Sequence, residues 1–535
     1  MIKNKYTMTH LLALSALMAM SLTHAAPAQR TSVKHIQQGP IQGLVQDEMQ
    51  QYKGIPYAQP PLADLRWQPP LPAKSWSDTR SADAFAPTCA TRISLGGFSA
   101  TSESEDCLYL NVYTPQTSKA NDKRPVMVVI PGGGLMTGSG NDYDPSYFID
   151  QDLIVVSLNY RVGVFGFFSH PALNSEGHPA INYGIIDQQA ALRWVKDNIT
   201  QFGGDPNNVT LYGESAGGQS VLTHLAAPAS AGLFHQGIVS SGAYSLTQRT
   251  VAAHNLAGEQ LAKNLGCEDT NPGKVAACLR SQSTTTLLDQ NLALTPSLGL
   301  NSDTPTIDGT ILPASFKTAF SSGQYNQVPV INGFNADEGS FFVGMMALEM
   351  DQPINMASFA QKLPMYLSAT KTRQVLDVLK TRPSSGNVGQ DFADVFGRAR
   401  FICTMPTTNA LLAQHVPVYG YEFADEQSST MIPDTTFRYG AAHINDLQYV
   451  FKDFRGDSGL LRPLTTPQKQ LSHAMVTYFS NFAKTGSPNS AGLPQWQAYS
   501  AKTDAFMRLH PSPEGFGMVA AMTERYGCAP YQTMD

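Results

Sequence analysis

The chain has 535 residues, of which 42% are hydrophobic and 15% are charged, so it is long enough to bury a large core. Its formal net charge is −6 and its basic residues form no cluster, which argues against a nucleic acid or an anionic membrane as its partner. The sequence contains no low-complexity tract and no internal repeat.

The first residues have the features of a secretory signal peptide. Lys3 and Lys5 supply positive charge, and residues 11–22 form an apolar segment that is too short to span a bilayer. Cleavage is expected after Ala25, and no later run is long and apolar enough for a membrane helix. We therefore expect an exported protein, periplasmic or secreted, without a membrane span. The expected division is a signal peptide at 1–25 and a single mature domain at 26–535.

Six cysteines are present, and an even number in an exported protein suggests three disulfides. Six cysteines permit fifteen pairings, so the sequence alone does not choose among them. None has a Cys-x-x-Cys or Cys/His spacing, which argues against a zinc site or a redox motif. Cys89–Cys107 and Cys267–Cys278 are natural short-range pairs. They leave Cys403 to pair with Cys528.

The first half of the chain alternates between predicted strands and helices. Residues 36–57 alternate polar and apolar side chains and predict an antiparallel N-terminal hairpin. Residues 125–130 and 153–158 are continuous apolar runs, typical of strands that are buried on both faces. Residues 186–199 have the spacing of a helix.

The motif Gly-Glu-Ser-Ala-Gly at 213–217 carries the strongest functional signal. It follows an apolar strand at 209–212 and precedes a helical segment at 218–225. Gly-x-Ser-x-Gly between a strand and a helix is the nucleophile elbow of hydrolases, because the tight turn holds an exposed serine at the positive end of a helix. The five-residue pattern alone is weak, so this context identifies Ser215 as a candidate nucleophile.

The second half continues with short strands at 235–240 and 328–333. Residues 348–401 have helical character and predict a lobe over the sheet, and 471–483 predict an amphipathic helix. Strands that alternate with helices predict a doubly wound α/β fold with a mostly parallel central sheet.

Several longer motifs surround the elbow in a fixed order. Together they resemble the type-B carboxylesterase family, which includes the cholinesterases and non-catalytic adhesion proteins, and the resemblance covers almost the whole mature chain. The resemblance implies the α/β-hydrolase fold with helical insertions over the active site. The motifs are YKGIPYA at 52–58, SEDCLYLNV at 104–112, GGG at 132–134, NYRVG at 159–163, NYG at 182–184, DQQ at 187–189 and FGGDPNNVT at 202–210.

A serine nucleophile needs a base and an acid that orients the base. In α/β-hydrolases both follow the serine in the chain. The resemblance implies Glu338, in NADEGSF at 335–341, as the acid and His443, in GAAHINDL at 440–447, as the base. Glu338 also lies just past a predicted strand, where such sheets place ligands. Asp337 is the alternative acid.

The oxyanion that forms on attack needs positioned N–H donors. The resemblance implies the N–H groups of Gly133, Gly134 and Ala216. Many relatives carry histidine before the three glycines, whereas this chain has Pro131, which removes only its own N–H. Leu135 replaces a phenylalanine found in many relatives, which we expect to reshape a substrate pocket.

Glu214 and Ser241 are further candidates. In relatives the glutamate before the nucleophile and the serine of a Ser-Gly pair belong to a polar network near the histidine. Local capping or turn chemistry explains each residue equally well.

The substrate class follows from what the sequence lacks. Cholinesterases place a tryptophan in the first disulfide loop to stack on a quaternary ammonium, whereas residues 89–107 contain Phe98 and no tryptophan. Met345, Met346 and Met350 either line an apolar pocket or belong to the core. We expect an uncharged small to medium ester as substrate, an acyl-enzyme intermediate, and no metal or organic cofactor.

Two other functions remain open from sequence. The same residues serve hydrolysis of amides, carbamates or polymer esters. A non-catalytic binding or adhesion relative is the alternative from another class, although such relatives usually lack the serine or the histidine that this chain keeps. The oligomeric state is not predicted.

Overall fold

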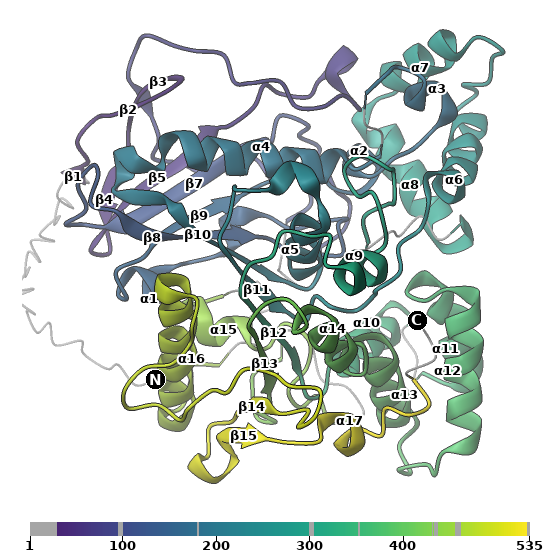
Figure 1. The fold of residues 1–535 in the computed structure, drawn as a ribbon. Helices are drawn as coiled ribbons and strands as arrows, with labels where there is room; N and C mark the ends of the chain where they lie inside the picture. Colours follow the sequence, from purple (N-terminus) through teal and green to yellow (C-terminus); the bar gives the residue numbers. More distant parts are fainter. Residues whose placement is uncertain are drawn as a thin grey trace, which may run out of the picture.

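The computed structural model describes residues 29–94, 100–178, 181–298, 304–350, 354–430, 432, 437–454 and 462–531. The predicted signal peptide and Phe98 lie outside these residues. A twelve-stranded sheet runs through the molecule, and a three-stranded sheet lies beside it (Figure 1). The strands of the large sheet are β1 (Gln29–Arg30), β4 (Leu44–Gln46), β5 (Met49–Pro56), β7 (Tyr109–Pro115), β8 (Arg124–Ile130), β9 (Ile154–Leu158), β10 (Gly204–Glu214), β11 (Gln236–Ser240), β12 (Val330–Asn335), β13 (Val418–Phe423), β14 (Phe506–Leu509) and β15 (Gly517–Val519).

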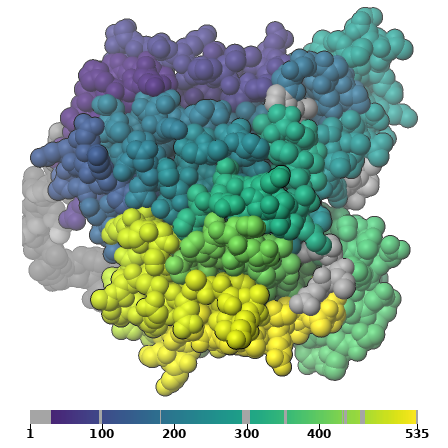
Figure 2. All heavy atoms as spheres, viewed as in Figure 1, coloured from purple at the N-terminus to yellow at the C-terminus, as the bar shows by residue number. Residues whose placement is uncertain are grey.

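The strand order is β1-β4-β5-β7-β9-β8-β10-β11-β12-β13-β14-β15. All neighbours from β9 to β14 pair in parallel, and the strands at both ends pair antiparallel. In Figure 2 the N-terminal part of the chain, in purple, covers one end of the molecule, and the C-terminal part, in yellow, covers the other. This arrangement confirms the predicted doubly wound, mostly parallel sheet.

Both faces of the sheet are covered by helices, which explains the continuous apolar runs. In β8, Val126 and Val128 pack into one core cluster with side chains of α4 and α5, whereas Met127 and Val129 pack into a second cluster with α15 and α16. All four side chains are fully buried. The helices are α1 (Ser146–Ile149), α2 (Gly163–Gly166), α3 (Pro171–Asn174), α4 (Tyr183–Asn198), α5 (Ala216–Ala226), α6 (Val251–Asn264), α7 (Pro272–Ser281), α8 (Thr284–Leu298), α9 (Phe316–Ser322), α10 (Gly339–Met350), α11 (Met356–Lys362), α12 (Ala369–Thr381), α13 (Val388–Gly397), α14 (Thr404–Leu412), α15 (Leu447–Val450), α16 (Thr466–Thr485) and α17 (Met522–Arg525).

The N-terminal region differs from the single hairpin predicted at 36–57. β2 (Lys34–Ile36) and β3 (Gly39–Gln42) form one antiparallel pair in the small sheet, with β6 (Arg80–Ser81) beside them, whereas β4 and β5 form another pair in the large sheet. Gly43 separates the two pairs, and a Cβ there would lie 2.1 Å from the carbonyl oxygen of Gln51. The chain therefore changes sheets at a glycine, which alternation of polar and apolar residues does not reveal.

The predicted helical lobe at 348–401 consists of α10 to α13 and the π-helix η6 (Arg398–Ile402), which form a separate core cluster. Figure 1 shows these helices beside the C-terminal half of the sheet, with α6, α7 and α8 above them. The structure pairs the cysteines as Cys89–Cys107, Cys267–Cys278 and Cys403–Cys528. None of the helices in the described ranges has the length and apolar character to cross a membrane.

Candidate active site

Ser215 lies in the turn between the end of β10 and the start of α5. Its backbone has φ 53° and ψ −122°, which a non-glycine residue rarely adopts. A Cβ on Gly213 would lie 2.2 Å from the backbone of Gly217, and a Cβ on Gly217 would lie 2.1 Å from the carbonyl oxygen of Ile130. The two glycines therefore make this tight turn possible, and the turn holds the serine in its strained conformation.

Two loops that are far apart in sequence meet beside this serine. The loop after β12 and the loop before α15 form an isolated parallel bridge between Asp337 and Ala442, and the Asp337 N–H donates to the Ala441 carbonyl at 2.9 Å. This pairing places Glu338 next to His443.

Ser215, His443 and Glu338 form one hydrogen-bonded chain. His443 Nε2 lies 2.9 Å from Ser215 Oγ, and His443 Nδ1 lies 2.5 Å from Glu338 Oε2. Glu338 is fully buried and the histidine is 2% exposed. An imidazole between a hydroxyl and a buried carboxylate can accept the serine proton, because the carboxylate stabilises the imidazolium that forms.

Asp337, the alternative acid, points away from the histidine. Its carboxylate accepts a hydrogen bond from the Ala441 N–H at 2.8 Å and forms an ion pair with Arg438 at 3.1 Å. Burial raises the pKa of Asp337, partly offset by the charge of Arg438. The geometry therefore favours Glu338 over Asp337.

The second oxygen of Glu338 is held by two donors. Its Oε1 accepts the backbone N–H of Asn335 at 2.8 Å and the hydroxyl of Ser241 at 2.6 Å. Ser241 follows β11 and has φ 49°. The Ser-Gly serine thus contacts the acid rather than the histidine.

Glu214 approaches the histidine from another side. Its Oε1 lies 3.3 Å from His443 Nε2, and both residues are almost fully buried. Among the described residues neither oxygen of Glu214 has a hydrogen-bond partner. Burial raises the pKa of Glu214 well above its usual value, and the nearby carboxylates of Asp446 and Glu338 raise it further.

Asp446, a third buried acid at this site, was not anticipated. It accepts hydrogen bonds from the Ser240 hydroxyl at 2.5 Å and from the Asn335 side-chain amide at 3.2 Å. The same amide donates to the Ala442 carbonyl at 2.7 Å, so Asn335 fastens the histidine loop to the end of β12. Burial raises the pKa of Asp446. The position of Asp446 three residues after His443 was the one available signal.

Aromatic rings surround the imidazole. The ring centroids of Phe341, Phe342 and Phe401 lie 6.0, 4.9 and 4.8 Å from that of His443. Phe341 and Phe342 belong to α10, and Phe401 belongs to η6. No sequence pattern marked these rings as site residues, and three helices separate Phe401 from the other two.

The three-glycine loop after β8 lies against the elbow. A Cβ on Gly132 would lie 2.8 Å from the Glu214 carbonyl oxygen and 3.4 Å from Ser215 Cβ. Gly133 has φ 104° and Gly134 has φ 65°, so the chain turns sharply beside the serine. The N–H of Ala216 belongs to the first turn of α5, which leaves it free of an intrahelical partner.

The remaining candidates near the loop are buried. The carbonyl oxygen of Pro131 accepts the Tyr160 hydroxyl at 2.9 Å, and Leu135 is 1% exposed. Met346 is fully buried in the lobe core, while Met345 and Met350 pack against two different core clusters. Met346 therefore belongs to the core, whereas Met345 and Met350 are half-buried beside different clusters. Across the described ranges, no group of three or more His, Cys, Asp or Glu side chains is arranged to hold a metal ion.

Comparisons with known proteins place this site in a family context. A profile described as the carboxylesterase family matches residues 30–527. Rabbit (Oryctolagus cuniculus) liver carboxylesterase 1 is 33% identical over 513 residues, which cover 88% of this chain and 86% of the relative. Human (Homo sapiens) cocaine esterase is 32% identical over 484 residues, which cover 87% of this chain and 84% of the relative. The solved structure of a PNB esterase has a TM-score of 0.77 and 29% identity, and covers 94% of this chain and 100% of that one.

Proposed function

Because the chain belongs to the carboxylesterase family and is therefore a serine hydrolase of carboxylic esters, we propose that Ser215 is its nucleophile, His443 its base and Glu338 its acid. The observation that carries this assignment is the continuous hydrogen-bonded chain from the serine hydroxyl through the imidazole to a fully buried carboxylate.

The reaction proceeds in two symmetrical halves. Ser215 Oγ attacks the ester carbonyl carbon while its proton passes to His443 Nε2, and Glu338 stabilises the imidazolium. The imidazolium then protonates the departing alcohol, which leaves an acyl-enzyme on Ser215. Water attacks this acyl group with the same base, releases the acid and restores the serine hydroxyl.

The negative oxygen of each tetrahedral intermediate is stabilised by the N–H groups of Gly133, Gly134 and Ala216. The close approach of the Gly132 backbone to Ser215 supports this role, since it sets donors beside the attacked carbon. Each such donor contributes about 3–4 kcal/mol to transition-state stabilisation. Pro131 precedes these donors and leaves their N–H groups in place.

Glu214 and Ser241 act through the triad. Ser241 positions Glu338 by bonding the oxygen that the histidine does not use. The raised pKa of Glu214 favours its neutral carboxyl, so Glu338 is the acid whose charge stabilises the imidazolium of His443.

The substrate is an uncharged small to medium ester. Three phenylalanine rings around His443 supply an apolar wall for an acyl or alcohol group. The relatives include a cocaine esterase and a rat pyrethroid hydrolase, Ces2e, names that describe those proteins only. The family assignment does not favour the amide, carbamate and polymer-ester alternatives or the non-catalytic one.

The mature enzyme is exported to a periplasm or secreted, as a single domain at 26–535 after loss of the signal peptide at 1–25. Three disulfides support an oxidising compartment. N-terminal sequencing of protein recovered from periplasmic extract and culture medium tests the cleavage site. A mature chain that still begins at Met1 would contradict it.

The catalytic assignment is tested with a fluorophosphonate probe and a chromogenic ester. Wild-type protein should be labelled and should hydrolyse the ester, whereas Ser215→Ala should do neither. Ser175→Ala is the control, because that hydroxyl donates to the Ala172 carbonyl in α3, away from the elbow. Equal labelling of Ser215→Ala and wild type would show that another residue is the nucleophile.

A further inference from the structure

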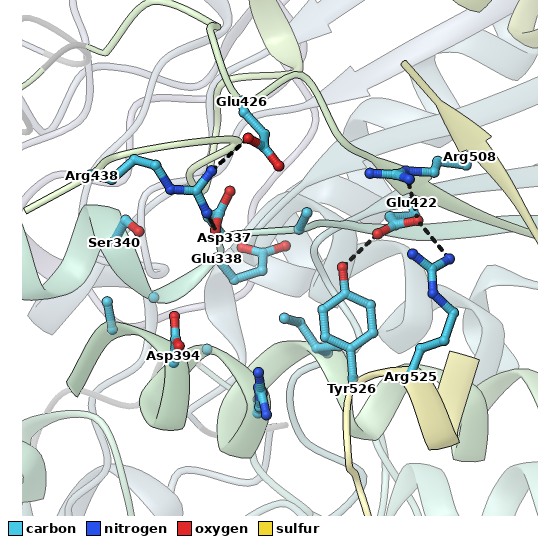
Figure 3. A pocket seen from close by; sticks show the side chains of 16 residues that line it. Asp337, Glu338, Ser340, Asp394, Glu422, Glu426, Arg438, Arg508, Arg525 and Tyr526 are labelled. Atoms are coloured by element: carbon cyan, nitrogen blue, oxygen red, sulfur yellow. Dashed lines mark hydrogen bonds and ion pairs between the residues drawn. The ribbon is translucent and has the colours of Figure 1, made fainter. Parts of the chain in front are cut away.

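A polar cavity of about 280 Å³ is lined by Glu338 and the residues around it, and His443 is not part of its lining. Its wall is built from the loop between β12 and α10, the end of α13, β13, β14 and α17 (Figure 3). Four arginines line it, Arg398, Arg438, Arg508 and Arg525. The hydrolytic mechanism uses none of them.

The charges in this cavity are unevenly distributed. On one side a single arginine, Arg438, serves two acids, since it contacts Asp337 at 3.1 Å and Glu426 at 2.8 Å. On the other side a single acid, Glu422, faces two arginines, Arg508 and Arg525. Figure 3 shows the two guanidinium groups approaching Glu422 from opposite sides.

The contacts on the arginine-rich side are incomplete. Glu422 Oε1 accepts the Tyr526 hydroxyl at 2.5 Å, but Oε2 lies 3.5 Å from Arg508 Nε and 3.8 Å from Arg525 Nη1. Both Glu422 Oε2 and Arg508 Nε are buried atoms without a hydrogen-bond partner in the described structure. Glu422 itself is 1% exposed, so its carboxylate depends on these arginines for compensation.

Arg398 supplies a further guanidinium to the cavity lining. It lines the cavity, and within the described ranges it has neither an ion pair nor a side-chain hydrogen bond. Asp394, one helical turn earlier, is held by Arg382 at 3.4 Å and by Gln390 at 3.0 Å. Among the described residues, Arg398 is therefore the arginine of this lining that has no carboxylate partner, while Arg508 and Arg525 share Glu422.

We propose that this cavity binds a small oxyanion, a carboxylate or a phosphate, between Arg398, Arg508 and Arg525. The planar guanidinium presents paired N–H donors that match the geometry of both groups, and charge-assisted hydrogen bonds of this kind are stronger than neutral ones. The bound anion supplies the negative charge that Glu422 alone does not provide and gives Arg398 a partner.

The test is isothermal titration calorimetry, in which inorganic phosphate is titrated into the whole protein and the dissociation constant is measured. Chloride keeps the ionic strength constant. Wild type should bind phosphate saturably, and Arg398→Gln and Arg508→Gln should each weaken binding about tenfold. Arg373→Gln is the matched control, because Arg373 is an exposed arginine of α12 outside the cavity. A parallel titration with acetate decides whether the site prefers a carboxylate or a phosphate.

Glu422→Gln tests the charge argument in the opposite direction. Removing the carboxylate that Arg508 and Arg525 share should tighten phosphate binding, whereas loss of a merely structural contact would not. Arg398→Gln keeps the experiment interpretable if the buried substitutions unfold the protein, since this side chain makes no pairing contact. Absence of saturable binding of both anions, or equal affinity in wild type and Arg398→Gln, would overturn the proposal.

Discussion

The hydroxyl of Ser241 donates a 2.6 Å hydrogen bond to Oε1 of Glu338, whose other oxygen lies 2.5 Å from His443. The two residues are 97 positions apart, and each follows a neighbouring strand of the parallel sheet, β11 and β12. The carboxylate is thus fixed at both oxygens, so the direction in which it presents its charge to the imidazole is fixed as well.

Removing this hydroxyl should slow catalysis without weakening substrate binding. Ser241→Ala is expected to lower kcat about tenfold with little change in KM, because a hydrogen bond to a charged group contributes about 1.5–3 kcal/mol. Steady-state kinetics on a chromogenic ester measure both constants.

Two further variants sharpen this test. Ser241→Gly relieves the positive φ of the residue and should lose the same activity, which separates the hydroxyl from backbone strain. Ser245→Ala is the control, because that hydroxyl bonds the nearby Thr247 carbonyl instead. Wild-type kcat in both Ser241 variants would refute a positioning role.

The adjacent acids Glu338 and Asp337 form a matched pair for assigning the catalytic acid. Glu338→Gln should lower kcat by about 10⁴-fold, the effect expected when the acid that orients a catalytic histidine becomes an amide. Asp337→Asn should retain kcat within about tenfold, because that carboxylate contacts Arg438 and the Ala441 N–H rather than the imidazole.

Kinetics of the two purified variants, with folding checked by circular dichroism, provide the measurement. A larger loss in Asp337→Asn than in Glu338→Gln would reverse the assignment.

The elbow could be predicted because all of its determinants are local. The strand at 209–212, the flanking glycines and the helix after Ser215 follow one another within a few residues. The family motifs then indicated Glu338 and His443, and the structure brings both to the serine. Their placement depends on the bridge between Asp337 and Ala442, which no local pattern reveals.

The supporting residues could not be predicted, because they too come together only through contacts between distant parts of the chain. Asn335 and Asp446 are 111 positions apart and meet only because the histidine loop returns to the end of β12. Phe401 reaches His443 from η6 after three helices have intervened. Near the N-terminus, the alternation at 36–57 correctly predicted extended chain. It predicted one hairpin, whereas the backbone turns at Gly43 and forms two, β2 with β3 and β4 with β5.

The disulfides offer a stability test with an internal control. The bond between Cys403 and Cys528 spans 125 residues and ties the C-terminal segment to the end of η6, whereas Cys267 and Cys278 are 11 residues apart. If loop entropy of the unfolded chain dominates, replacing the long-range pair by alanines should cost about 5 kcal/mol and replacing the short-range pair about 3 kcal/mol.

Urea unfolding of the two double variants measures this ranking. Equal losses, or a larger loss for Cys267→Ala/Cys278→Ala, would show that native packing around the bridges outweighs the loop effect.

The buried carboxyl of Glu214 should make stability depend on pH. Its pKa is raised above the usual 4.5 by burial and by two neighbouring acids, so the folded protein keeps this proton to a higher pH than the unfolded chain does. The stability that this group contributes is therefore complete below about pH 4.5 and is lost as the pH rises toward its folded pKa.

The variant Glu214→Gln imitates the protonated acid, so it should not lose this stability as the pH rises. The difference in Tm between the variant and wild type should be small near pH 4 and should grow in favour of the variant toward pH 8, as measured by thermal unfolding across this range. Glu268→Gln, at an exposed position, should show no such trend. A difference for Glu214→Gln that stays constant with pH would mean that folding does not raise the pKa of this carboxyl.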